Sequence, residues 1–161
     1  MMQNEKPLAG YRVLVVEDEY FIARDLQAVL QTQGAEVVGP FASLEKALQQ
    51  AKRDGFEVAV LDINLQGAEG YPVADELRQQ GVPFVFASAY SEDRIPLRFA
   101  DVHLWQKPYS EHALVEDIRR LCEEAQSGQR TISSAQPPSD LTGWLWTGLI
   151  ERISLDQRSW R

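Results

Sequence analysis

The apolar residues of this chain gather in short, uninterrupted runs rich in β-branched and aromatic side chains. The three clearest runs are residues 11–16 (YRVLVV), 57–61 (EVAVL) and 82–86 (VPFVF). Strands that are buried on both faces of a sheet have this continuous apolar pattern, whereas half-exposed strands alternate. We therefore expect three buried strands here, and two weaker ones at residues 35–38 and 102–105.

Between and after these runs the apolar residues recur at intervals of three and four, which is typical of one face of a helix. Ser43 is suited to cap a helix, and Pro72 and Gly81 to open and close another. Pro96 lies in the short connection 89–100, where its missing N–H should break a fourth helix. The helices that we expect cover residues 21–30, 44–51, 72–80 and 110–124.

Strands and connecting segments alternate along the chain as five βα units. Because right-handed crossovers carry the chain back across a sheet, this order predicts an α/β fold with a parallel sheet and helices on both faces. In such folds ligands bind at the carboxyl ends of the strands, where the strand order reverses. The residues that follow the predicted strands are therefore the candidates for chemistry.

The net negative charge of the chain bears on which partners it can bind. With 24 acidic and 16 basic residues the net charge is −8, and residues 126–161 hold few of the acidic ones. An acidic body disfavours nucleic acid, which is bound through Lys and Arg. The chain has no apolar run suited to a signal peptide or a membrane span, and its one cysteine is Cys122. We expect a cytoplasmic domain that binds neither nucleic acid nor membranes.

Polar side chains follow four of the predicted strands. Glu17 and Asp18 follow the first, Asp62 follows the third, Ser88 ends the fourth, and Lys107 follows the fifth. Clustered carboxylates repel one another unless a cation lies among them, and Mg²⁺ prefers oxygen ligands. A carboxylate can also attack phosphorus to form an acyl phosphate, whose oxygens a lysine and a hydroxyl can bind. The strand ends thus predict a Mg²⁺ site beside a nucleophilic aspartate, Asp62.

The chain resembles the response-regulator receiver family over nearly all of residues 10–124. Four segments carry the resemblance in this order: VLVVEDE (13–19), VLDINL (60–65), FASAY (86–90) and QKPY (106–109). The whole set makes it specific, since no one segment would suffice. The resemblance implies a flavodoxin-like, doubly wound (βα)5 receiver domain at residues 10–125, with a five-stranded parallel sheet of strand order 2-1-3-4-5.

The resemblance also implies which residues hold the metal. Glu17 and Asp18 match the acidic pair that the family uses for Mg²⁺, and Asp62 matches its phosphoacceptor. Asn64 should offer its backbone carbonyl to the same ion. Glu17, Asp18, Asp62 and Asn64 are therefore the expected metal ligands.

Two further residues match the family's reaction. Lys107 matches the lysine that pairs with the phosphoryl group, and Ser88 matches the switch hydroxyl that moves towards it. A receiver accepts its phosphoryl group from a histidine kinase or a histidine phosphotransfer protein and then changes its contacts with an output protein. It promotes only its own phosphorylation and dephosphorylation, so we expect no separate substrate.

The sequence departs from the family pattern near the fourth and fifth strands. Many receivers have an aromatic switch residue three positions before the lysine, where this chain has Leu104. The FASAY segment resembles instead a subgroup of single-domain receivers with Phe-Ala-Thr-Gly-Tyr-like sequences, in which Tyr90 would take over signalling. His103 and His112 have no spacing that suggests a metal site or a general base, and we interpret them as structural or exposed.

Two other functions fit part of the pattern. A phosphatase of the haloacid dehalogenase type also uses an aspartate nucleophile and Mg²⁺, but needs an acidic residue two positions later, where this chain has Asn64. A pseudo-receiver would bind partners without phosphorylation, and the complete set of acidic residues with Lys107 argues against it. Each site residue alone has an ordinary explanation, such as a helix cap or a solvated charge.

The C-terminal part of the chain has a different composition. Residues 126–140 (QSGQRTISSAQPPSD) are rich in Ser, Gln and Pro and are interpreted as a linker. The pattern of residues 141–161 predicts an amphipathic C-terminal tail, in which Trp144 would belong to one apolar helical face. That face would be buried on the same receiver, on a second subunit in a homodimer, or on another protein. The alternative is an apolar sequence with no role.

Overall fold

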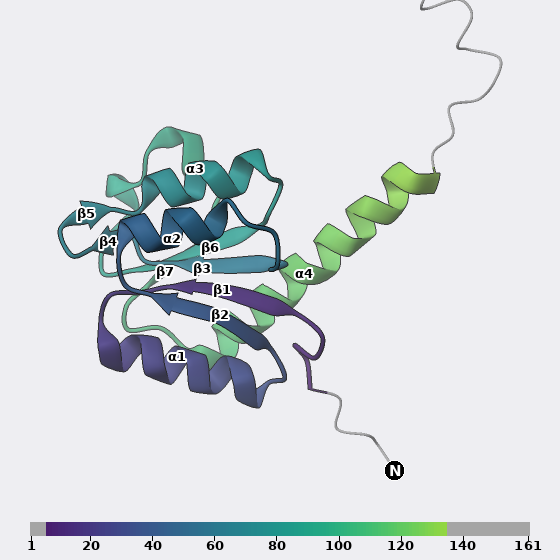
Figure 1. Ribbon diagram of the computed structural model, residues 1–161, viewed down its shortest axis with the longest axis horizontal. Coiled ribbons are helices and arrows are strands. Elements are labelled where there is room, and N and C mark those ends of the chain that lie inside the picture. Colours follow the sequence, from purple (N-terminus) through teal and green to yellow (C-terminus); the bar gives the residue numbers. More distant parts are fainter. Residues whose placement is uncertain (1–5, 135–161) are drawn as a thin grey trace, which may run out of the picture. The chain divides into compact units, whose positions relative to one another are not determined.

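Five parallel strands form the central sheet of the protein, whose structure, a computed structural model, describes residues 6–134. In spatial order the sheet is β2-β1-β3-β6-β7 (Figure 1). Counted along the chain within this sheet, the order is 2-1-3-4-5, which confirms the predicted flavodoxin-like topology. The strands are β1 (Arg12–Val16), β2 (Glu36–Phe41), β3 (Val58–Leu61), β6 (Phe84–Ser88) and β7 (Leu104–Gln106).

Helices cover both faces of the sheet. The helices α2 and α3 lie on one side and α1 on the other (Figure 1). Within β1, Leu14 and Val16 pack into the apolar core beneath α2 and α3, while Val13 and Val15 pack beneath α1 and the start of α4. This alternation explains why the strand is apolar at consecutive positions. The helices are α1 (Tyr20–Thr32), α2 (Leu44–Ala51), α3 (Tyr71–Gln79) and α4 (Glu111–Ser134).

The connection between β6 and β7 contains no α-helix, as Pro96 predicted. Two short 3₁₀ turns take its place, η1 (Glu92–Arg94) and η2 (Leu97–Phe99). The ring of Phe99 is fully buried in the core next to α3. The five predicted βα units are therefore present as five strands, four of which are followed by an α-helix.

A small antiparallel hairpin, which the sequence analysis did not predict, follows β3. Its strands are β4 (Asn64–Leu65) and β5 (Ala68–Glu69). Gly70 then begins α3, and a Cβ atom placed on it would lie 2.6 Å from the carbonyl oxygen of Asp62. Only a glycine therefore fits at position 70 without a shift of the backbone that carries Asp62.

The last helix is longer than expected. It ends at Ser134, whereas the pattern predicted an end near residue 124, so the first part of the predicted linker 126–140 is helical. No proline interrupts the chain between Pro108 and Pro137, and Arg119 and Arg120 form ion pairs one turn along the helix, with Glu123 and Glu124.

By its internal contacts the chain divides into two units, Met1–Ala125 and Gln126–Arg161. The predicted tail, residues 141–161, lies outside the described residues. Within residues 6–134 the structure has no helix both long and apolar enough to span a membrane.

Candidate functional site

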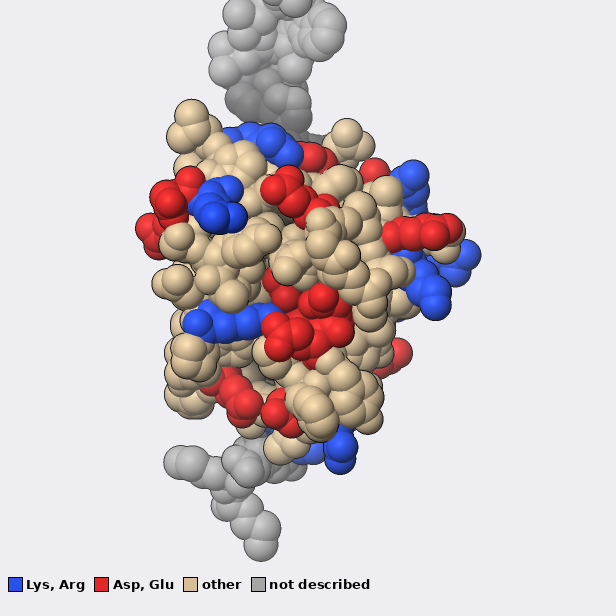
Figure 2. Space-filling view, turned by 90° about the vertical axis from the view of Figure 1, so that its left-hand side faces the viewer, with Lys and Arg blue, Asp and Glu red and all other residues tan. Residues whose placement is uncertain are grey.

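The carboxyl ends of the strands meet at one edge of the sheet, and acidic side chains gather in the middle of that face (Figure 2). Glu17 and Asp18 directly follow β1, Asp62 follows β3, Ser88 ends β6 and Lys107 follows β7. The parallel topology therefore brings together side chains that are far apart in the sequence, at the edge where such folds bind ligands.

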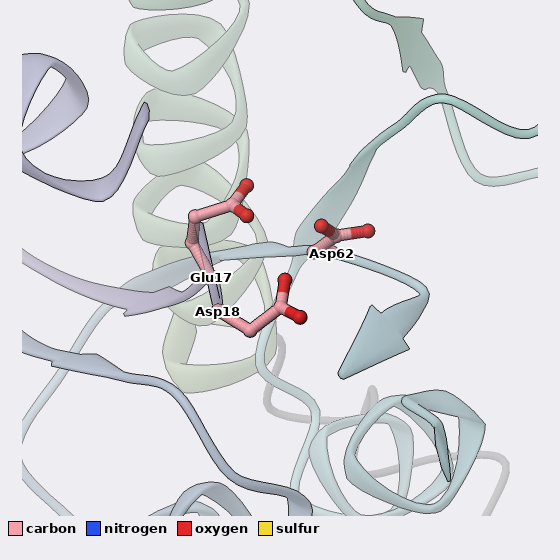
Figure 3. Close-up of side chains that lie close together, drawn as sticks. All are labelled: Glu17, Asp18 and Asp62. Atoms are coloured by element: carbon pink, nitrogen blue, oxygen red, sulfur yellow. The ribbon is translucent and has the colours of Figure 1, made fainter. Parts of the chain in front are cut away.

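Three carboxylates form the centre of this face. Each of Glu17, Asp18 and Asp62 offers an oxygen, and these oxygens lie within 4.8 Å of one another. The three side chains lie around one common space (Figure 3). Glu17 is 3% and Asp62 4% exposed, while Asp18 is half-buried. Buried carboxylates so close together need compensating positive charge.

Backbone N–H groups hold these carboxylates in place. Asp62 Oδ1 accepts a hydrogen bond from the N–H of Asn64 at 3.0 Å, and Glu17 Oε1 accepts one from Glu19 at 3.0 Å. Asp18 Oδ2 accepts one from Gln66 at 2.9 Å. The Asp62 N–H in turn donates to the carbonyl of Val16 at 2.8 Å, which ties the end of β3 to β1.

Lys107 supplies the positive charge within the cluster. Its Nζ lies 2.8 Å from Glu17 Oε2, 2.9 Å from Asp62 Oδ2 and 3.6 Å from Glu19 Oε1, and its side chain is 11% exposed. Burial alone would lower the pKa of Lys107, but the bonds to Glu17 and Asp62 outweigh it and raise the pKa above its usual range. The lysine therefore stays charged.

One ammonium does not balance the carboxylates. Burial raises the pKa of Glu17 to about 7, and the nearby Asp62 charge adds to this effect while the hydrogen bonds from Lys107 and Glu19 oppose it. A further cation would relieve this excess of negative charge. The donor set consists of oxygens from three acidic side chains, which suits a hard cation such as Mg²⁺ and not a soft metal.

Ser88 and Asn64 lie at the rim of the cluster. Ser88 is buried, and its carbonyl accepts the N–H of Lys107 at 2.8 Å. Its Oγ accepts the N–H of Tyr90 at 3.3 Å. Asn64 reaches the site through its N–H, while its side-chain oxygen accepts the N–H of Gly67 at 3.1 Å. The structure thus brings the side chains of Glu17, Asp18, Asp62 and Lys107 into direct proximity, while Asn64 contacts Asp62 through its backbone N–H and Ser88 contacts Lys107 through its carbonyl.

Three residues at or near the cluster were not among the predicted site residues: Glu19, whose Oε1 lies 3.6 Å from Lys107 Nζ, Gln66 and Tyr109. The backbone N–H of Gln66 donates a hydrogen bond to Asp18, and no pattern of side chains in the sequence predicts such a bond. Tyr109 is half-buried near the site, where burial raises its pKa to about 12 with a contribution from Glu17. Tyr109 lies two positions after Lys107 in the QKPY segment, and this short separation could have indicated that it lies near the site.

Within the part of the chain that the structure describes, the remaining candidates form no hydrogen bond or ion pair with Glu17, Asp18 or Asp62. His103 and His112 are both exposed, and His103 Nδ1 lies 2.7 Å from Asp117 Oδ2. Leu104 is half-buried at the position of the usual aromatic residue. Tyr90 is half-buried as well, with the guanidinium of Arg94 5.2 Å from its ring centre.

The chain matches the family model for the response regulator receiver domain over residues 13–119. It is 30% identical over 122 residues to the sensory transduction protein LytT of Bacillus anthracis, covering 72% of this chain and 49% of LytT. The chain spans about half the length of the first curated relatives that it matches.

Two solved structures have a similar fold. SdrG from Sphingomonas melonis Fr1 is 32% identical, with a TM-score of 0.62 over 73% of this chain and 98% of SdrG. The receiver domain of the sensor histidine kinase PA1611 from Pseudomonas aeruginosa PAO1 is 24% identical, with a TM-score of 0.62 over 71% of this chain and 99% of that domain. That structure has a magnesium ion in its active-site cleft.

The family match extends from β1 through the first part of α4 and includes every residue of the carboxylate cluster as well as Lys107 and Ser88. It covers more than half of the chain. The chain therefore belongs to the response regulator receiver domain family of two-component signalling.

Proposed function

We propose that this chain is a phosphorylation switch, in which Asp62 accepts a phosphoryl group from the phosphohistidine of a histidine kinase or a histidine phosphotransfer protein. The observation that supports this most strongly is the placement of Asp62. Its carboxylate is almost fully buried, lies 2.9 Å from Lys107 Nζ, and stands beside two further carboxylates that suit a metal ion. A purely structural aspartate would not need such neighbours.

In the proposed transfer an oxygen of Asp62 attacks the phosphorus atom of phosphohistidine. A P–O bond forms as the P–N bond breaks, and the imidazole leaves with the electron pair and takes up a proton. The N–H of Asn64 and the ammonium of Lys107 hold one carboxylate oxygen each. Once the Asp62 carboxylate has become an acyl phosphate and lost its own charge, Lys107 is close enough to bind the phosphoryl oxygens.

Glu17, Asp18 and Asp62 would hold Mg²⁺, with the backbone carbonyl of Asn64 as a further proposed ligand. The ion supplies positive charge for the phosphoryl oxygens. The magnesium-containing receiver domain of PA1611 supports this choice of metal. The chain's own contribution is to keep three carboxylates at one place, held by backbone N–H groups from Glu19, Asn64 and Gln66.

The signal would leave the site through Ser88 and Tyr90. A turn of the Ser88 hydroxyl towards a phosphoryl group would release the N–H of Tyr90, and with it the start of the segment that contains η1. We propose that this change alters contacts with an output protein in the cytoplasm. Self-association through residues 141–161 is a further part of the proposal, motivated by the apolar pattern around Trp144.

The test is phosphorylation by a small phosphodonor. We expect the 161-residue chain with Mg²⁺ and acetyl phosphate to gain a single phosphoryl group by intact-mass spectrometry, and Asp62→Asn to gain none. Asp54→Asn, a change of an exposed aspartate after α2, is the matched control and should be labelled like the wild type.

Chelation of Mg²⁺ should abolish the phosphorylation of the wild type and of Asp54→Asn. If the chain is a pseudo-receiver, neither the small phosphodonor nor a histidine kinase should phosphorylate the wild type or either variant. Full labelling of Asp62→Asn would show that the phosphoacceptor is another residue.

A further inference from the structure

The short hairpin after β3 is built around a turn that few residues can adopt. The strands β4 and β5 pair Asn64 with Glu69 and Leu65 with Ala68, so only Gln66 and Gly67 remain at the tip. Both have positive φ angles, 55° and 86°. A two-residue turn with both φ angles positive matches the right-handed twist of its strands, and glycine, asparagine and aspartate are the residues that usually adopt it. The turn is thus maintained against the ordinary preference of Gln66.

This hairpin contacts the carboxylate cluster at two points. At its base the N–H of Asn64 donates to Asp62 Oδ1, and at its tip the N–H of Gln66 donates to Asp18 Oδ2. The turn is closed by the Asn64 side chain, which accepts the N–H of Gly67. The buried side chain of Leu65 holds the hairpin in the core. A rigid loop therefore connects two of the three acidic residues.

Asp18 depends on this loop more than the other two carboxylates do. Glu17 and Asp62 both lie within ion-pair distance of Lys107, whereas the ion pairs of Lys107 within the described part of the chain do not include Asp18. Asp18 is also the most exposed of the three acidic residues. Without a donor, its side chain would be free to turn into solvent and away from Glu17 and Asp62.

We propose that the β4–β5 hairpin is a positioning element for the cation, and that the backbone N–H of Gln66 holds the Asp18 carboxylate in the cluster. One oxygen of Asp18 accepts this N–H, which leaves its second oxygen for the metal. The role belongs to the backbone of Gln66 and to the turn that aims it, and the Gln66 side chain has no part in it. This inference rests on the proposed Mg²⁺-dependent function.

Gly67 offers a test with a matched control. Gly67 and Gly81 both have positive φ angles, and a Cβ atom on either would meet nothing within 4 Å. Gly67→Val and Gly81→Val should therefore strain the backbone alike, but only Gly67→Val disturbs the hairpin. We expect Gly67→Val to weaken Mg²⁺ binding about tenfold in isothermal titration calorimetry, as loss of a supporting hydrogen bond to a ligand does. Gly81→Val should keep the wild-type dissociation constant.

Two changes at position 66 separate the backbone from the side chain. Gln66→Gly keeps the N–H and relieves the strained φ angle, so its Mg²⁺ affinity should equal or exceed that of the wild type. Replacement of the residue 66 amide by an ester, through an α-hydroxy acid introduced by nonsense suppression, removes the donor alone. It should weaken Mg²⁺ binding even if Gly67→Val does not fold.

The outcomes distinguish this inference from the function on which it rests. If the wild type binds no Mg²⁺ in the calorimeter, both are wrong. If the wild type binds Mg²⁺ and the ester variant binds it equally well, the hairpin does not position Asp18, and the proposed phosphorylation of Asp62 is unaffected. Weaker binding by Gln66→Gly would assign the effect to the side chain and would overturn the inference as well.

Discussion

Asp62 and Asp117 are both buried aspartates with several hydrogen-bond donors, and their surroundings differ in one respect. Asp62 shares Lys107 with Glu17 and lies beside Asp18, so carboxylates outnumber cations around it. Asp117 lies in α4 and accepts hydrogen bonds from Trp105 Nε1 at 2.9 Å and Arg120 Nη2 at 2.6 Å, with His103 Nδ1 at 2.7 Å.

The comparison separates a carboxylate whose oxygens are matched by their own hydrogen-bond donors from one that lies in an excess of acidic groups. Around Asp117 each oxygen has donors of its own, and its function is complete when α4 is tied to β7. Around Asp62 the carboxylates outnumber the cations, which favours the binding of a further cation. Burial alone does not distinguish the two residues, since both are less than a tenth exposed.

The largest expected effect comes from Lys107→Met, which removes the cation of the Asp62 cluster. Breaking a buried ion pair leaves uncompensated charge, so we expect the free energy of unfolding without Mg²⁺ to fall by about 3 kcal/mol. Added Mg²⁺ should recover part of the loss by binding the native state. Urea denaturation with and without Mg²⁺ measures both. A loss that Mg²⁺ leaves unchanged would contradict the idea that the cluster needs positive charge.

Asp117→Asn should have a smaller effect that does not respond to Mg²⁺. The variant keeps the shape of the side chain but loses charge-assisted hydrogen bonds, and we expect a loss of about 1.5 kcal/mol at pH 7. The same urea experiment applies, and recovery by Mg²⁺ would be evidence against a purely structural role.

The pH dependence of stability gives Asp117 a second test. Burial would raise its pKa, but the hydrogen bonds from Arg120, Trp105 and His103 outweigh burial and lower it. The stabilisation by Asp117 is thus complete above the unfolded-state pKa of about 3.9 and is lost as the pH falls through the lower folded-state value. Below about pH 4 the wild type should lose stability more steeply than Asp117→Asn. Parallel curves would mean that Asp117 does not titrate with unfolding.

Asp101→Asn gives the baseline for an exposed ion pair. Asp101 pairs with Arg78 of α3 at 2.9 Å, but its side chain is 72% exposed. Solvent screens such pairs, so we expect a loss below about 1 kcal/mol. The midpoint of urea denaturation should hardly move. A loss as large as that of Lys107→Met would remove the distinction between buried and exposed pairs in this protein.

The sequence predicted the fold and the convergence of Glu17, Asp18, Asp62 and Lys107 because both depend on strong local patterns. Continuous apolar runs located β1, β3 and β6, and Pro96 located the connection without a helix. The polar residues directly after these strands could be assigned to one site since parallel topology brings strand ends together. That step needed no knowledge of side-chain conformations.

Features that depend on weak or competing patterns were missed. The strands β4 and β5 have two residues each, too few for a periodic pattern, and Gln66 is a rare residue at a positive φ angle. The end of α4 was placed too early because the Ser- and Gln-rich composition after Ala125 was interpreted as a linker. Ser and Gln are compatible with the interior of a helix, and no proline interrupts the chain before Pro137.

The close fit of Gly70 against the carbonyl of Asp62 has a consequence for how this protein can vary. The chain must return to the same point at position 70 whatever sequence lies before it, because any side chain there would displace the backbone of Asp62. Residues 64–69 thus form a loop with fixed ends. Other two-residue turns would fit at its tip, whereas an inserted residue would have to bulge out of the hairpin. A redesign of this loop should therefore keep its length, because the backbone N–H of residue 66 must still reach Asp18.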